Sequence, residues 1–114
     1  IASELGRLVR AARDDALRQS DLGGASLTIS NLGMYEIDRF FPVVNPPEAL
    51  IIGVGRVRET PVARDGLIGV RRVLTCSYAV DHRAVDGALC GEFAQAFKRC
   101  LETPERLVKA EVRG

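Results

Sequence analysis

The sequence predicts a single α+β domain in which helices pack against a mixed, largely antiparallel sheet. Three observations carry this prediction: a helical period at each end, strand-like patterns between them, and one Asp-Gly hairpin turn. The 114 residues allow one compact domain. Hydrophobic residues make up 46% and charged residues 27%, which are ordinary proportions for a globular chain.

Helices are expected at both ends of the chain. Apolar residues recur at three- and four-residue spacing over residues 2–19, a stretch followed by the Gly23-Gly24 pair. A second helical period runs from Ala88 to Leu101 and closes near Thr103-Pro104. A last short helix is expected over Glu105–Ala110.

Two strands are expected around a long loop. Leu27–Ser30 contains β-branched residues, and Ala49–Val57 has the composition of a buried strand. Gly53 and Gly55 within the second strand indicate a close approach by another part of the backbone. Residues 31–47 show no sustained period, so they predict a long ordered loop, and loops of this length are usually functional.

The remaining strand patterns form a hairpin and one further strand. Pro61–Ala63 and Leu67–Val70 flank Arg64-Asp65-Gly66, which carries the Asp-Gly turn signal. Val73–Val80 alternates in character and is expected to be a central strand with mixed faces.

Charge and cysteine content narrow the possible functions. Sixteen basic and fifteen acidic residues give a net charge of +1, which supplies no field for nucleic-acid binding. The longest apolar stretch, Ala49–Val54, is far shorter than the ~20 residues of a membrane helix. Cys76, Cys90 and Cys100 lack metal-ligand spacing, so we expect reduced cysteines, no metal site and a cytosolic-type protein.

His82 is the single histidine and the first candidate for chemistry. It lies between the last expected strand and the second helix, where a short loop on a rigid scaffold presents functional groups. An imidazole exchanges protons near neutral pH, and Asp86 could orient it or stabilise its charged form. Alternatively, Asp86 is a helix N-cap and His82 an ordinary loop residue.

Ser30 is the second candidate. It lies in Thr28-Ile29-Ser30-Asn31-Leu32-Gly33, where hydroxyl and amide groups at a strand end could donate hydrogen bonds to a developing oxyanion. The alternative is that Ser30 and Asn31 merely end a strand and begin a turn. Composition and spacing alone therefore stop at an α+β domain with a possible acid–base histidine.

A succession of motifs extends this interpretation over residues 1–108. The order of these motifs resembles the catalytic domain of the dihydrolipoamide acyltransferases, the core subunits of 2-oxo acid dehydrogenase complexes. The motifs are Gly23-Gly24, the Thr28–Tyr35 block, Val44-Asn45-Pro46-Pro47-Glu48, Gly53-Val54-Gly55, Asp81-His82-Arg83 with Asp86-Gly87, and Pro104.

The resemblance implies a chloramphenicol-acetyltransferase-like fold and transfer of an acyl group between dihydrolipoamide and coenzyme A. It implies that His82 is the general base, that Asp86 is the motif aspartate and that Ser30 stabilises the oxyanion. Coenzyme A would be a substrate, and the lipoyl group would be carried on a domain absent from these residues. Residues that contact coenzyme A are not predicted.

The resemblance also implies an assembly. The expected unit is a homotrimer whose sites lie between chains, with serine and histidine from different subunits, and trimers of the family associate into larger cores. The implied partners are a lipoyl domain and the decarboxylase and dihydrolipoamide dehydrogenase components. The implied location is the bacterial cytoplasm, or the mitochondrial matrix in a eukaryote.

Length and two departures qualify the resemblance. The family's catalytic domain is about twice as long, so we expect residues 1–114 to be its C-terminal half, inactive alone and exposing apolar surface. Glu36 stands where the family usually has glycine, and a charged segment follows Leu107 where an apolar end helps trimers associate into a shell. Acetyl transfer is favoured; branched-chain acyl or succinyl transfer, or a non-catalytic structural homologue, are the alternatives.

Overall fold

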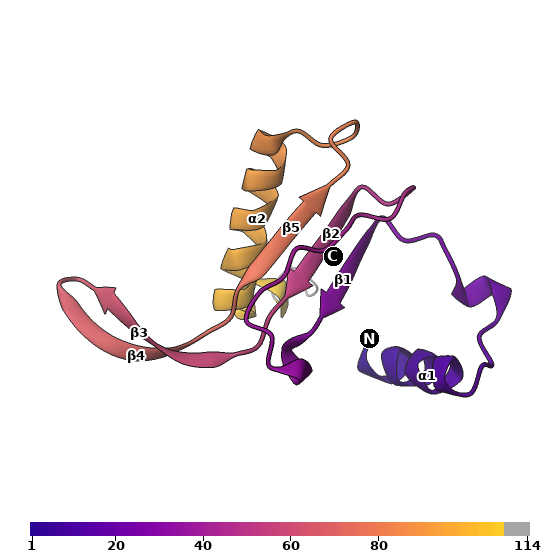
Figure 1. Cartoon of the computed structure of the whole chain (residues 1–114), viewed down its shortest axis with the longest axis horizontal. Helices are drawn as coiled ribbons and strands as arrows, with labels where there is room; N and C mark the ends of the chain where they lie inside the picture. The colour runs from indigo at the N-terminus through magenta and orange to yellow at the C-terminus, as the bar shows by residue number, and fades with distance from the viewer. Residues whose placement is uncertain (109–114) are drawn as a thin grey trace.

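The structure is a computed structural model that describes residues 1–108. Helices flank five strands, with two short 3₁₀ turns among them (Figure 1). In chain order the elements are α1 (Ala2–Arg13), η1 (Gln19–Asp21), β1 (Leu27–Asn31), η2 (Gly33–Tyr35), β2 (Leu50–Val54), β3 (Arg58–Arg64), β4 (Leu67–Val73), β5 (Cys76–Val80) and α2 (Gly87–Glu102).

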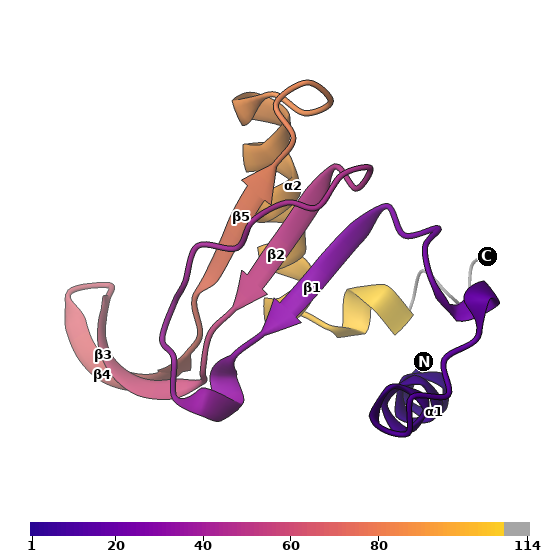
Figure 2. The same cartoon turned by 45° about the vertical axis from the view of Figure 1, so that its right-hand side comes forward.

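Three strands form the central sheet in the order β1-β2-β5 (Figure 2). β1 runs parallel to β2, and β5 runs antiparallel to it, so the sheet is mixed as expected. Ile52 in the middle of β2 is fully buried, with neighbours on both sides and side chains packed against one face. The alternation of strand side chains therefore gives this sheet two distinct faces.

Helix α2 covers the first face through aromatic contacts. The ring of Tyr78 on β5 meets Phe93 and Phe97 edge-on, at centroid distances of 6.4 and 6.3 Å. Edge-to-face packing is a favourable arrangement for such rings. Because Tyr78 stands opposite Ile52 in the register, the same face carries the buried side chains of β2.

The loop between β1 and β2 covers the opposite face. The ring of Phe40 lies over Gly53, so close that a side-chain carbon there would come within 3.0 Å of it. At Gly55 the space is taken by the carbonyl group of Asp38, and only glycine fits. These contacts confirm the predicted ordered loop, and they confirm the close backbone approach at Gly55, whereas at Gly53 the approaching group is the Phe40 side chain.

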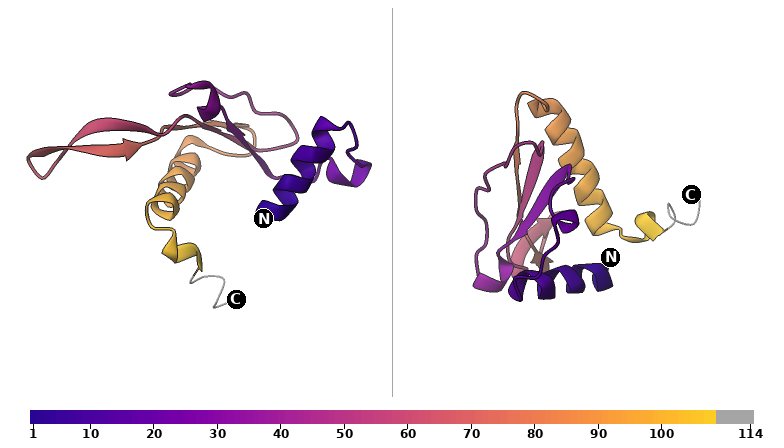
Figure 3. Two further views of the ribbon diagram at one scale, coloured as in Figure 1. Left: turned by 90° about the horizontal axis from the view of Figure 1, so that it is seen from below. Right: turned by 90° about the vertical axis from the view of Figure 1, so that its right-hand side faces the viewer.

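The β3–β4 hairpin projects from the body as an arm (Figure 3). Asp65 and Gly66 have φ angles of 53° and 78°, which are the positive values that a two-residue hairpin turn requires. The predicted hairpin and its turn are confirmed, with strands longer than expected.

The first helix is shorter than predicted. The expected helix over residues 2–19 is wrong beyond Arg13, where α1 ends, and Asp15 adopts a positive φ of 52°. Two consecutive aspartates follow Arg13, and carboxylates are unfavourable at the negative end of the helix dipole. The apolar period continues past this point, but the helix ends at Arg13, directly before the two aspartates.

The prediction of one central strand over Val73–Val80 is also wrong. β4 ends at Val73, residues 74–75 are not in a strand, and β5 is an edge of the described sheet. The central strand is β2, which is shorter than the expected Ala49–Val57. A mixed-face pattern suits an edge strand as well as a central one, because both have side chains on two faces.

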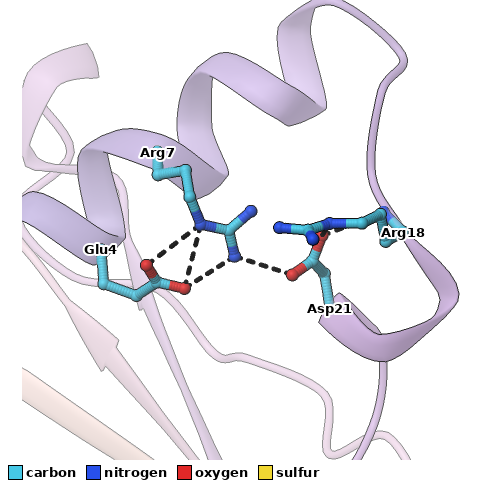
Figure 4. Close-up of polar contacts among 4 residues, drawn as sticks. All are labelled: Glu4, Arg7, Arg18 and Asp21. Carbon is cyan, nitrogen blue, oxygen red and sulfur yellow. Dashed lines mark hydrogen bonds and ion pairs between the residues drawn. The ribbon is translucent and has the colours of Figure 1, made fainter.

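Ionic contacts attach α1 to the segment that precedes β1 (Figure 4). The Arg7 guanidinium bonds Glu4 one turn earlier and also reaches Asp21 in η1, at 2.7 Å in each case. Asp21 accepts a further hydrogen bond from the Arg18 N–H. The Arg7 side chain holds the pKa of Asp21 below its ordinary value, and the Arg18 N–H lowers it further.

Much apolar surface is exposed, as the sequence predicted. The chain exposes 9394 Å², against about 6,100 Å² for a compact chain of this mass. Its radius of gyration is 16.9 Å, compared with about 13 Å for a compact domain. Ile29, which lies on the helix-covered face of the sheet, is still 56% exposed. This face of the sheet therefore presents apolar surface to solvent.

The described C-terminal residues continue beyond α2. Residues 105–108 are helical, and the rest of the helix expected over Glu105–Ala110 lies outside the described residues. Within residues 1–108, no helix is long and apolar enough to cross a membrane.

Candidate active site

Ser30 lies at one end of the central sheet. It pairs with Gly53 across the parallel ladder, and Gly53 pairs in turn with Ser77 on β5. This row of small residues lies on the loop-covered face, and the Phe40 ring occupies the space above Gly53. Ser30 is half-buried, and its place on the strand fixes its backbone.

Thr28 shares the face of Ser30 because the two residues are two positions apart on β1. Its hydroxyl donates a hydrogen bond to the Glu48 carboxylate. The Ala49 N–H donates to the Ser26 carbonyl beside this contact. The end of the long loop is thereby joined to β1, one pleat from Ser30.

His82 lies in a tight turn directly after β5. The Asp81 N–H donates to the Ala49 carbonyl, which fixes the start of the turn to the beginning of β2. The Asp81 carbonyl then accepts from the N–H groups of Ala84 and Val85, at 2.9 and 3.0 Å. The turn is well anchored, and the His82 side chain is exposed at its surface.

Asp86 caps the second helix. Its carboxylate accepts from the Leu89 N–H at 2.8 Å, and its backbone is extended, as an N-cap requires. This confirms the capping interpretation. Within residues 1–108 the carboxylate bonds the helix rather than the imidazole of His82. Any effect of Asp86 on His82 in this structure is therefore through space, and its role in chemistry stays a prediction.

The two predicted catalytic side chains lie at opposite ends of the sheet. β1 and β5 are antiparallel to each other across β2, so the end of β1 and the end of β5 point in opposite directions (Figures 1 and 2). From Ser30, Val80 is three residues along and two strands across, which is roughly 14 Å by strand geometry. His82 lies beyond Val80. A hydrogen-bonded site cannot form between Ser30 and His82 of one chain in this arrangement.

A hollow of about 300 Å³ lies beside the histidine turn, between α2, the starts of β1 and β2, and the end of β5. Its walls are almost entirely apolar, and Val80 and Val85 line it on either side of the turn. A larger hollow of about 690 Å³ lies at the far end of α2, away from His82. Neither hollow identifies the residues that contact coenzyme A.

Metal ligands do not cluster in the described part of the chain: among residues 1–108, no three His, Cys, Asp or Glu side chains gather in a metal-binding group. The three cysteines are free, and burial raises the pKa of the Cys76 thiol. The expectation of a site without metal stays a prediction.

The fold is that of an acyltransferase catalytic domain. The family described as 2-oxoacid dehydrogenases acyltransferase (catalytic domain) matches residues 1–109. The chain belongs to this family.

Two curated relatives of this chain are acetyltransferase components. The chain is 38% identical over 104 residues to the dihydrolipoyllysine-residue acetyltransferase component of the pyruvate dehydrogenase complex of Rickettsia bellii. It is 40% identical over 108 residues to the component of the same name from Staphylococcus epidermidis. These alignments cover 91% and 95% of this chain but 25% of each relative. The chain thus spans about a quarter of the length of the curated relatives it matches.

Solved structures agree with the fold prediction. The dihydrolipoamide acetyltransferase of Azotobacter vinelandii superposes with a TM-score of 0.89 at 33% identity, over 94% of this chain and 44% of that one. A probable dihydrolipoamide acetyltransferase from Listeria monocytogenes gives 0.84 at 34% identity, over 89% and 43%. The predicted fold class and family are confirmed.

Two sets of contacts near the site were not predicted. One is the bond from Thr28 to Glu48, and the other is the set of bonds between Asp81 and Arg83. An Asp followed two residues later by a backbone donor is a common turn signal, and it could have identified the second set. Nothing in the local sequence indicates the first, because it joins residues far apart in the chain.

Proposed function

We propose that this chain supplies catalytic groups for transfer of an acetyl group between a dihydrolipoyl group and coenzyme A. Family membership and the acetyltransferase names of the relatives support the reaction class. The observation that carries the residue assignment is spacing. The Azotobacter vinelandii structure is from a study of a serine, a histidine and an asparagine in the catalytic mechanism of that enzyme. Ser30, His82 and Asp86 stand at the same separations in this sequence.

The chemistry begins with proton removal. A thiol with an ordinary pKa near 8.5 is mostly protonated at neutral pH, so it needs a base to become a nucleophile. The exposed imidazole of His82 takes the proton from the coenzyme A thiol. The thiolate attacks the carbonyl carbon of the acetyl-lipoyl thioester, and negative charge collects on the carbonyl oxygen.

The second half of the reaction returns the proton. The Ser30 hydroxyl donates a hydrogen bond to the oxyanion, an interaction that is worth about 3 kcal/mol in well-organised sites. Collapse of the tetrahedral intermediate breaks the carbon–sulfur bond to the lipoyl group and forms acetyl-coenzyme A. The departing thiolate takes the proton from the imidazolium of His82. The cycle ends with His82 neutral and no group left on the protein.

The site proposed here lies between two copies of the chain. The separation of Ser30 and His82 by the whole width and length of the sheet supports a site that combines the serine of one copy with the histidine of another. The exposed apolar surface is compatible with burial in an assembly. One of the similar solved structures is the cubic core of a pyruvate dehydrogenase multienzyme complex. A homotrimer, served by a lipoyl domain and the other enzyme components, is part of this proposal.

Complementation between inactive variants tests this function in the intact protein. Ser30→Ala should lower kcat about 100-fold and His82→Ala at least as much, measured as transfer from acetyl-coenzyme A to dihydrolipoamide. Co-assembly of the two variants restores activity, since about a quarter of the sites then combine an intact serine with an intact histidine. Unrestored activity in mixed assemblies would overturn the shared site. Near-normal turnover of His82→Ala alone would overturn the general base.

A further inference from the structure

The turn that carries His82 is held from both sides by a single carboxylate. Asp81 Oδ1 accepts from the Arg83 N–H at 3.0 Å, which closes a local loop over His82. The Arg83 side chain folds back onto the same carboxylate, with its Nε on Oδ1 at 3.0 Å and its second bond on Oδ2 at 2.8 Å. The residues on either side of the imidazole are therefore joined by three hydrogen bonds.

We propose that Asp81 and Arg83 are positioning residues for His82, which hold its turn in one geometry and balance the charge beside its imidazole. This inference rests on the proposed function, because it assigns a role relative to the proposed base. Asp81 fits the geometric part: its backbone is tied to Ala49, Ala84 and Val85, and its side chain is only 19% exposed. The imidazole is carried on a turn that has few other conformations available.

The contact between Asp81 and Arg83 brings two opposite charges together. The Arg83 side chain is 82% exposed, yet its guanidinium bonds the Asp81 carboxylate instead of solvent or a distant partner. Exposed ion pairs contribute little to stability, so stability alone is a weak reason for this geometry. Because the two charges are opposite and in direct contact, the pair carries no net charge.

Two other carboxylates of the described residues, on segments next to the turn, also accept hydrogen bonds. Asp86, from the start of α2, bonds the Leu89 N–H of its own helix. Glu48, from the segment before β2, accepts the hydrogen bond from the Thr28 hydroxyl. The N-terminus of α2 adds a partial positive charge on the same side of the turn. Asp81 and Arg83 are the two charges that lie next to His82 in the chain.

Two kinds of substitution separate geometry from charge. Asp81→Asn keeps an oxygen that can accept the Arg83 N–H but removes the negative charge, whereas Asp81→Ala removes both. Arg83→Gln leaves the Asp81 carboxylate without its cation. An unpaired anion beside the imidazole favours the protonated form, and an unpaired cation disfavours it. The two charge variants should therefore shift proton binding in opposite directions.

The experiment combines histidine NMR with kinetics on the intact protein. A selectively labelled sample gives the His82 imidazole signal, which is identified by its loss in His82→Ala. Arg83→Gln should move the midpoint of that signal, and the acidic limb of the kcat/KM profile, up by roughly half a pH unit. Asp81→Asn should move both down by a similar amount. Asp81→Ala should lower kcat about 10- to 100-fold by loosening the turn.

Asp21→Asn is the matched control. Asp21 also accepts from an arginine side chain and from a backbone N–H, but it lies in η1 next to α1. The Asp21→Asn variant should leave the midpoints of the His82 signal and of the acidic limb of the kcat/KM profile unchanged. Midpoints that stay within about 0.1 pH unit in the Asp81 and Arg83 variants, or that move in the same direction, would overturn the inference. A His82→Ala variant that keeps its turnover would instead overturn the proposed function, so the two failures are distinguishable.

Discussion

The two ends of the central sheet are built in different ways. At the serine end, residues of the long loop between β1 and β2 close over β2 from more than ten positions earlier in the sequence, with Phe40 on Gly53 and Asp38 on Gly55. At the histidine end, contacts among Asp81 to Val85 build the turn, and one backbone bond to Ala49 attaches it. The first end depends on long-range packing, and the second on local hydrogen bonds.

This difference separates stability from chemistry. Changes at the serine end should be felt by the whole sheet, because the loop and three strands share the space there. Changes at the exposed His82 should alter the reaction and leave the fold intact.

His82→Ala should have the largest effect on function. General bases contribute about 100- to 10,000-fold, so kcat/KM for acetyl transfer should fall by about 1,000-fold. The side chain is exposed, so the free energy of unfolding should change by less than about 0.5 kcal/mol. Steady-state kinetics with thermal unfolding on the same sample measures both. A large loss of stability would show that the histidine end is not merely a local structure.

Gly55→Ala should have the largest effect on the fold. A methyl group there collides with the backbone carbonyl of Asp38, and neither backbone can move without displacing β2 or the loop. The free energy of unfolding should fall by about 3 kcal/mol or more.

Gly69→Ala is the matched control for Gly55→Ala. Gly69 lies on the exposed hairpin arm, and a methyl group there meets no atom within 4 Å. Its effect should stay within about 0.5 kcal/mol in denaturant unfolding. Equal effects at the two glycines would contradict the close approach at the serine end.

Asp86→Ala should have a smaller effect at the histidine end. Losing the hydrogen bond to the Leu89 N–H should cost about 1 kcal/mol of stability. Asp86→Asn should be nearly neutral, because asparagine caps helices as well as aspartate does. If the asparagine variant is as unstable as the alanine variant, capping is not what Asp86 contributes. Denaturant unfolding of the two variants decides this.

Acid should produce the smallest effect, and it should act at both ends. The Arg83 side chain holds the pKa of Asp81 below its ordinary value of about 3.8, and the Arg56 side chain does the same for Asp38 at the serine end. A depressed pKa contributes stability that is present above the ordinary value and is lost as pH falls through the folded value. The temperature at the midpoint of thermal unfolding should therefore fall as the pH is lowered below about 4.

Asp81→Asn and Asp38→Asn provide the comparison for this acid effect. Each variant lacks one of the titrating carboxylates, so its thermal midpoint should depend less steeply on pH below pH 4 than that of the wild type. Identical slopes for wild type and both variants would show that these ion pairs do not contribute to acid sensitivity.

The sequence predicted features whose signals lie within a few residues. The Asp65-Gly66 turn, the Asp86 cap and the buried character of Leu50 to Val54 were all confirmed, because each follows from local conformation or composition. The end of α1 at Arg13 differs from the prediction because the apolar period of the sequence continues beyond the end of the helix. The position of β5 at an edge was missed because strand order depends on pairing between distant segments.

For the candidate site, too, local features follow from the sequence and the spatial arrangement does not. The sequence by itself determined which residue types could act, since a single histidine, a serine at a strand end and the surrounding motifs are all visible in it. Only the tertiary structure decided that Ser30 and His82 stand at opposite ends of one sheet, roughly 14 Å or more apart. The physical reason is that strand direction and order come from hydrogen bonds and side-chain burial between distant segments, which no local pattern encodes.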